Sequence, residues 1–156
     1  NILAHSIDWK GFEDIPVLDV FAGTGALGLE AMSRGASSGV FIDNEVSALQ
    51  CIRANAGTLS EARNILTLKL DATRLFPPPL AAHAPLALVF LDAPYGTRLS
   101  DPALLGLCHK GWIAPGGVVV VEISKDDYFT PPLEFSILEK RTYGAAQITF
   151  LQFKGA

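Results

Sequence analysis

Short apolar runs alternate along the chain with longer segments in which apolar residues recur at helical spacing. The apolar runs lie at residues 17–22, 39–43, 65–70, 86–91 and 118–123, and each is predicted to form a strand. The run 86–91 is apolar throughout, which is typical of a central strand covered on both faces. Strands that alternate with helices predict a parallel sheet flanked by helices, so the predicted fold class is α/β.

Helices are predicted between these strands. The first begins at Thr24 or Gly25 and ends before Gly35, a residue suited to the position just after a helix. Asn44 is placed to cap the second helix. The apolar residues of that helix share one face and are Val46, Leu49, Ile52 and Ala56. A third helix is expected around residues 102–110.

The pattern changes towards the C-terminus. Residues 115–117, Pro-Gly-Gly, are predicted to form a turn into the strand at 118–123. Residues 135–141 and 147–153 then predict an antiparallel hairpin joined by a turn at Tyr143-Gly144. Five alternating units and a final hairpin fit a mostly parallel, seven-stranded class I methyltransferase sheet, Rossmann-like with helices on both faces. They fit this sheet better than the all-parallel dinucleotide-binding fold.

Composition is consistent with this fold. A chain of 156 residues with 49% hydrophobic composition fits a single domain, 1–156, with its own core. No apolar run approaches the roughly 20 residues that a membrane span needs. The formal net charge of −4 gives no support for a basic nucleic-acid face, although basic side chains can still gather on one side.

The spacing of cysteine and histidine residues indicates the redox compartment of the protein and whether a metal site is expected. Cys51 and Cys108 are far apart, which predicts small buried groups in a reducing, cytoplasmic setting. His5, His83 and His109 do not cluster at ligand spacings, so no metal site is expected.

A glycine-rich turn joins the first predicted strand to the first helix. The turn contains Gly23, Gly25 and Gly28, and glycine at such positions lets the backbone turn tightly and approach a ligand. The candidate cofactor residues here are Phe21, Ala22, Gly23, Thr24, Gly25 and Gly28. Dinucleotide-binding proteins share this spacing and bind a pyrophosphate at the helix N-terminus. The turn alone therefore leaves a dinucleotide and S-adenosylmethionine both open.

Acidic residues in and after successive strands favour the second cofactor. Asp19 lies just before the turn, where a carboxylate can reach the ammonium of a bound methionine moiety through water or backbone. A bound pyrophosphate is itself an anion, so it would not favour a carboxylate at this position. Asp43, followed by Asn44, is placed for a ribose diol, and Asp71 with the amide of Ala72 for an adenine. Each aspartate could instead cap a helix or turn. As a set at the C-terminal ends of parallel strands, they predict S-adenosylmethionine, with S-adenosylhomocysteine as product.

A tetrapeptide after the fourth strand is the candidate catalytic motif: Asp92, Ala93, Pro94 and Tyr95. An exocyclic amine on a base is a poor nucleophile because its lone pair is delocalised into the ring. The Asp92 carboxylate, which also counts among the cofactor residues, and the Ala93 carbonyl can accept its two N–H groups and orient the lone pair. Tyr95 can stack on the base. The alternative for these residues is an ordinary strand-ending turn.

With the glycine turn, this motif gives the chain a resemblance to a known family. It resembles the bacterial 16S ribosomal RNA guanine-N2 methyltransferases of the RsmD type over nearly its whole length. The matching segments are residues 17–36, 90–95 and Tyr143-Gly144. The resemblance implies a class I methyltransferase fold and N2-methylation of one loop guanine. It also implies 16S rRNA within the small subunit, or an assembly intermediate of it, as the partner. We expect a cytoplasmic monomer without membrane association.

Two features depart from the family. Ala93 replaces the first proline of the usual Asp-Pro-Pro-Tyr motif, which keeps the carbonyl but loses the fixed φ angle. The family's Arg-containing segment ahead of the position of Asn1 is expected to be missing, which would remove RNA contacts.

Two other functions stay open at this point. One is a methyltransferase acting on another amine, such as adenine N6 or a protein amide. The other is a dinucleotide-binding oxidoreductase or a non-catalytic nucleotide-binding module, although no second domain and no clear hydride-transfer acid or base are visible.

Overall fold

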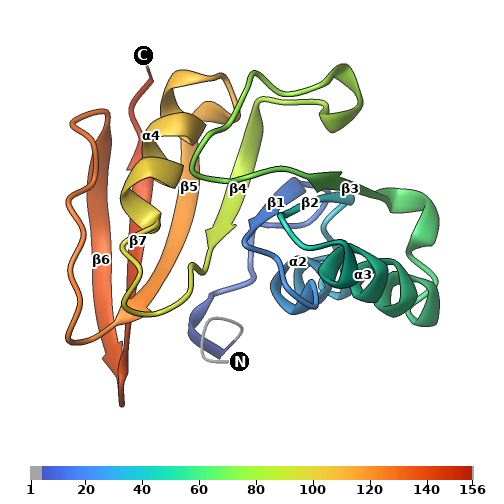
Figure 1. The fold of residues 1–156 in the computed structure, drawn as a ribbon, viewed down its shortest axis with the longest axis horizontal. Coiled ribbons are helices and arrows are strands. Elements are labelled where there is room, and N and C mark those ends of the chain that lie inside the picture. The colour runs from blue at the N-terminus through green and yellow to red at the C-terminus, as the bar shows by residue number, and fades with distance from the viewer. Residues whose placement is uncertain (1–4, 156) are drawn as a thin grey trace.

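Strands form where the chain has unbroken apolar runs, because a strand inside a parallel sheet is covered on both faces. The computed structural model describes residues 5–155, so the expectation about the segment ahead of Asn1 lies outside the described residues. The strands are β1 (Pro16–Val20), β2 (Ser38–Asp43), β3 (Ile65–Lys69), β4 (Leu86–Leu91), β5 (Ile113–Ser124), β6 (Phe135–Tyr143) and β7 (Ala146–Phe153). They form one seven-stranded sheet in the order β3-β2-β1-β4-β5-β7-β6 (Figure 1). The first five strands pair in parallel, and β7 is antiparallel to β5 and β6.

Helices cover the two faces of this sheet. The helices are α2 (Ala26–Ser33), α3 (Val46–Thr58) and α4 (Ser100–His109). Side chains of α2 and α3 pack with Val17, Phe41 and Phe90 on one face. Side chains of α4 pack with Leu18 and Val89 on the other. Figure 1 shows α2 and α3 side by side near β1 and α4 beside β5 and β7. The predicted α/β class and class I sheet are confirmed. None of the helices in the described range is long and apolar enough to cross a membrane.

The strand order changes direction at β1. Strand β1 pairs with β2 on one side and with β4 on the other, while the chain runs through β2 and β3 before reaching β4. In open α/β sheets, a crevice forms at such a switch point, outside the C-terminal ends of the strands. The glycine turn follows β1, and the Asp92 tetrapeptide follows β4. Both motifs are therefore brought to the same crevice.

Two turn predictions near the C-terminus are wrong. Residues 115–117 lie inside β5, because the pairing shifts from Leu86↔Ile113 to Leu88↔Val118 and leaves extra residues on β5 as a bulge. The hairpin between β6 and β7 turns at Gly144-Ala145, whereas Tyr143 is still paired with Ala146. Gly144 takes a positive φ of 56° there, a conformation that favours glycine.

The first helix is attached to the sheet through Gly28. One carboxylate oxygen of buried Asp19 accepts a hydrogen bond of 2.9 Å from the Gly28 amide, in the first turn of α2. A Cβ on Gly28 would lie 2.5 Å from Cε1 of Phe41 on β2, so glycine is what lets the helix approach the sheet this closely. Gly28 is thus a packing residue beneath the turn.

Replacing Gly28 with Ala should destabilise the protein by about 1–3 kcal/mol, the usual cost of overpacking a filled core. The matched control is Gly57→Ala in α3, where an added Cβ meets nothing within 4 Å. Because alanine is the better helix former, this control should stabilise the protein by about 0.5–1 kcal/mol. Urea unfolding of both variants measures the difference, and equal effects would contradict the close approach at Phe41.

Candidate functional site

The backbone after β1 turns sharply over the ends of the strands. Phe21, Gly23 and Gly25 take positive φ angles of 57°, 57° and 78°. The amide of Gly25 donates a 2.7 Å hydrogen bond to the Ala22 carbonyl, which closes the turn. Phe21 is not a glycine, so its left-handed conformation is unusual and is held by the packing of its ring. The turn places the Phe21 side chain and Gly23 at the crevice.

Asp43 fastens this turn to the end of β2. One of its carboxylate oxygens accepts a 2.9 Å hydrogen bond from the Gly23 amide, and the other accepts one of 2.9 Å from the Glu45 amide. The prediction that Asn44 caps the second helix is wrong. Glu45 occupies the N-cap of α3 without a side-chain cap, and Asp43 supplies the nearby hydrogen bond instead.

Asp71 makes a local turn after β3. Its Oδ1 accepts hydrogen bonds of 2.9 Å from the Thr73 amide and 2.6 Å from the Thr73 hydroxyl. These hydrogen bonds stabilise the charged form and lower the pKa of the Asp71 carboxyl. Strand β3 ends at Lys69, so Asp71 follows the strand instead of ending it, and its carboxylate faces solvent there.

Two adjoining cavities open at the ends of the strands. The first, here called the β2–β3 cavity, has a volume of about 400 Å³. It is lined by Phe21, Ile42, Asp43, Asn44, Glu45, Leu70, Asp71, Ala72, Thr73, Pro94 and Leu99. The second, here called the β4–β5 cavity, has a volume of about 520 Å³. It is lined by Phe21, Gly23, Asp43, Asn44, Asp92, Ala93, Pro94, Tyr95 and Glu122. Phe21, Asp43, Asn44 and Pro94 line both, so the two cavities form one continuous crevice.

Most of the predicted site residues meet in this crevice, and some do not. The glycine turn contributes Phe21 and Gly23 to the lining, and the tetrapeptide contributes all four of its residues. Ala22, Thr24, Gly25, Gly28 and Asp19 are not among the lining residues. Asp19 is 1% exposed and acts from below the turn, through Gly28.

Three carboxyl groups gather on the same face of three adjacent strands. Asp19 lies on β1, Asp92 directly follows β4, and Glu122 lies on β5. The last paired residues of β4 and β5 are Leu91 and Val121, so the next residues are Asp92 and Glu122. Glu122 is 7% exposed. Sequence reasoning missed it, although a charged residue inside the apolar run 118–123 was a visible signal.

Burial changes the acidity of this cluster. Desolvation raises the pKa of Asp19 to about 7, against the opposing effect of the Gly28 hydrogen bond. Desolvation also raises the pKa of Asp92 to about 8, helped by a hydrogen bond to Glu122 and by the negative charges of Glu122 and Asp19. The raised pKa keeps the Asp92 carboxyl largely protonated at neutral pH.

Tyr95 stands beside the same acidic pair. Its side chain is 50% exposed. Partial burial raises the pKa of the Tyr95 hydroxyl, as do the charges of Glu122 and Asp92. Glu122 thus lies beside both polar side chains of the tetrapeptide and lines the same cavity.

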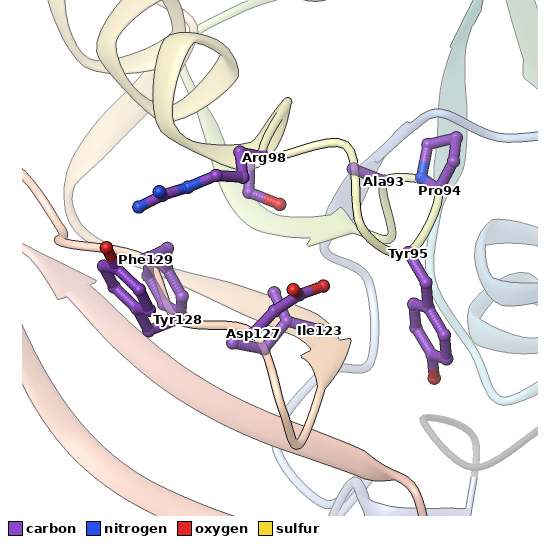
Figure 2. A pocket seen from close by; sticks show the side chains of 9 residues that line it. Ala93, Pro94, Tyr95, Arg98, Ile123, Asp127, Tyr128 and Phe129 are labelled. Carbon is purple, nitrogen blue, oxygen red and sulfur yellow. The ribbon is translucent and has the colours of Figure 1, made fainter.

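The loop after Tyr95 is fixed to the loop after β5. The Gly96 amide donates a 2.9 Å hydrogen bond to Asp127, and the Arg98 guanidinium lies 4.3 Å from the ring centre of Tyr128. Figure 2 shows Arg98 extending toward Tyr128, while Tyr95 points away from this pair. The two loops therefore hold the tetrapeptide from one side and leave the Tyr95 ring accessible.

The charge of the crevice limits what it can bind. No lysine or arginine lines either cavity within the described residues, whereas Asp43, Glu45, Asp71, Asp92 and Glu122 do. A pyrophosphate would face these carboxylates without a compensating cation. A ligand with a positive charge and hydrogen-bond donors fits them better.

The fold also brings together one group that histidine spacing did not reveal. Glu134 Oε2 accepts hydrogen bonds from the Cys108 thiol at 2.9 Å and pairs with His109 Nε2 at 3.1 Å. Burial and the nearby Glu134 raise the pKa of Cys108 to about 12. The Cys108 thiol and the His109 ring are thus joined through Glu134, which directly precedes β6.

The raised pKa of Asp92 predicts a pH-dependent stability. Unfolded aspartate loses its proton near pH 4, whereas folded Asp92 keeps it to about pH 8. The folded state binds more protons between these values, so this group's contribution to stability is lost as pH rises. The free energy of unfolding of Asp92→Asn, taken relative to that of the original protein, should therefore increase as pH rises. Urea unfolding at about pH 5.5 and about pH 8.5 checks this, and a difference that does not change with pH would contradict it.

Comparison with known proteins shows which family this chain belongs to. The family model described as Conserved hypothetical protein 95 matches residues 1–152. Ribosomal RNA small subunit methyltransferase D of Haemophilus influenzae is 31% identical over 139 residues, covering 86% of this chain and 70% of the relative. The protein of the same name from Escherichia coli is 30% identical over 132 residues, covering 84% of this chain and 65% of the relative.

Solved structures agree with these sequence matches. A candidate methylase of Haemophilus influenzae superposes with a TM-score of 0.78 at 25% identity, over 93% of this chain and 90% of that one. TrmN of Thermus thermophilus shares the fold with a TM-score of 0.74 at 23% identity, over 90% of this chain and 44% of that one. The match to the family model over residues 1–152 shows that the chain belongs to this family, that of the RsmD-type methyltransferases.

Proposed function

We propose that this protein transfers a methyl group from S-adenosylmethionine to the exocyclic N2 amine of a guanine in 16S ribosomal RNA. The observation that carries the proposal is the acidic crevice at the β1–β4 switch point, which the tetrapeptide and the glycine turn share. Relatives named ribosomal RNA small subunit methyltransferase D support the RNA class of the substrate. The small ribosomal subunit or an assembly intermediate of it is the proposed partner.

The cofactor is proposed to lie across both cavities. S-adenosylmethionine, when bound, supplies an electrophilic methyl group on a positively charged sulfur. The β2–β3 cavity offers Asp43 and Asn44 to a ribose and the strand end at Asp71 and Ala72 to an adenine. Phe21 and Pro94 supply apolar contacts at the junction of the two cavities. The carboxyl groups of the β4–β5 cavity suit the cationic end, which a dinucleotide lacks.

The tetrapeptide is proposed to hold the target amine. The Asp92 carboxylate and the Ala93 carbonyl accept the two N–H groups of the amine, which orients its lone pair toward the methyl group. A positive charge beside Asp92 favours loss of its proton, so that the carboxylate becomes an acceptor. The half-exposed Tyr95 ring stacks on the flipped base. After transfer, the nitrogen carries an extra proton, which the Asp92–Glu122 pair is placed to receive.

The direct test is methylation of small subunits from a strain that lacks this modification. We expect N2-methylguanine by mass spectrometry of the digested nucleosides. Asp92→Ala should lower methyl transfer by at least about 100-fold, because it removes the acceptor that orients the amine. Its affinity for S-adenosylhomocysteine should change little. N6-methyladenine or a methylated protein would contradict the guanine assignment, and full activity of the variant would contradict the role of Asp92.

A further inference from the structure

Glu122 is a buried acid with no counterion in the part of the chain that the structure describes. It is 7% exposed and lies among apolar residues of β5. The ion pairs within residues 5–155 are Arg34–Glu30, His109–Glu134 and Arg141–Glu139, and none includes Glu122. A buried carboxyl group without a cation is costly to keep, so its position in the cavity points to a ligand that carries donors.

The surroundings of Glu122 place it at the edge of the proposed base site. It lines the β4–β5 cavity together with Asp92 and Tyr95. It follows Val121, whose pairing with Leu91 brings Glu122 beside Asp92 on neighbouring strands. Its carboxyl group is also close enough to both neighbours to raise the pKa of Asp92 and of the Tyr95 hydroxyl. A base that stacks on Tyr95 and donates from its amine to Asp92 therefore also presents the edge that carries this amine to Glu122.

The bases differ at this edge. Guanine carries an N1–H donor next to its 2-amino group, so one edge presents neighbouring donors. Adenine has an amine there as well, but its N1 is an acceptor. An ionised carboxylate accepts hydrogen bonds and cannot donate them. Two carboxyl groups on strands about 4.8 Å apart suit the paired donors of guanine and oppose the acceptor of adenine.

We propose that Glu122 selects guanine by accepting a hydrogen bond from its N1–H while Asp92 accepts one from the 2-amino group. This inference rests on the proposed function and adds the residue that determines the base. It explains why β5 carries an acid beside the tetrapeptide. It also makes Glu122 a specificity residue that touches the substrate. The glycine turn and Asp43 bind the cofactor instead.

The test uses Glu122→Gln, which keeps the shape of the side chain and removes its charge. Methylation of the same modification-deficient small subunits should slow by about 10- to 100-fold, the usual loss when a hydrogen bond to a charged group becomes neutral. Affinity for S-adenosylhomocysteine, measured by calorimetry, should stay within about twofold. A wild-type rate in this variant, or an equal loss of cofactor affinity, would overturn the inference.

Two further variants separate this role from others. Asp126→Asn removes an exposed acid from the loop after β5 and should leave the rate unchanged, which controls for net charge. Tyr95→Phe keeps the ring and removes the hydroxyl, whose pKa Glu122 raises. If Tyr95→Phe reproduces the whole loss and the double variant is no slower, Glu122 acts only by holding Tyr95, and the inference fails. Which base the unaltered protein methylates tests the proposed function separately.

Discussion

The hydrogen bond from Gly28 to Asp19 determines how the first helix leaves the sheet. It joins the first turn of α2 to a buried position of β1 at 2.9 Å. Gly28 has no side chain at the point where α2 meets Phe41, and the helix packs close enough for this bond to form. With the helix so placed, the glycine turn lies over the strand ends, where Asp43 fastens it to β2. The crevice between β1 and β4 depends on this attachment.

Three carboxyl groups cluster close to this hydrogen bond. Asp19, Asp92 and Glu122 lie on adjacent strands, and their burial raises the pKa of Asp19 and Asp92 to about 7 and about 8. Without a ligand, this arrangement costs stability as pH rises from about 4 to about 8. A cationic donor and a base rich in N–H groups would offset that cost, because both compensate the carboxylates. Strain of this kind at a site is common where a ligand completes the structure.

Much of this architecture was visible in the sequence. The strands and helices followed from apolar periodicity, and the two candidate motifs were found because each directly follows a strand. The bulge at 115–117 was missed because a Pro-Gly-Gly sequence indicates a turn wherever it stands, and only the pairing with β4 shows that the strand continues. The Asn44 cap failed because Asp43, one residue earlier, already supplies the hydrogen bond.

Other features depend on contacts that no local pattern contains. Glu122 comes beside Asp92 through the pairing of β5 with β4, and Glu134 comes beside Cys108 through a loop that returns to α4. Asp19 was expected to interact with the bound ligand. Its observed hydrogen bond is with the amide of Gly28 in α2. Spacing along the chain could place these acids at strand ends, but the sheet register decides which of them meet.

The acidic crevice is proposed to bind a cationic methyl donor. Calorimetry at about pH 7 in buffers of different ionisation enthalpy measures the protons released when a ligand binds. Because Asp92 is protonated in the empty protein, S-adenosylmethionine binding should release roughly one proton. NAD should not bind measurably. Binding of S-adenosylmethionine without proton release, or tighter binding of NAD, would contradict the account.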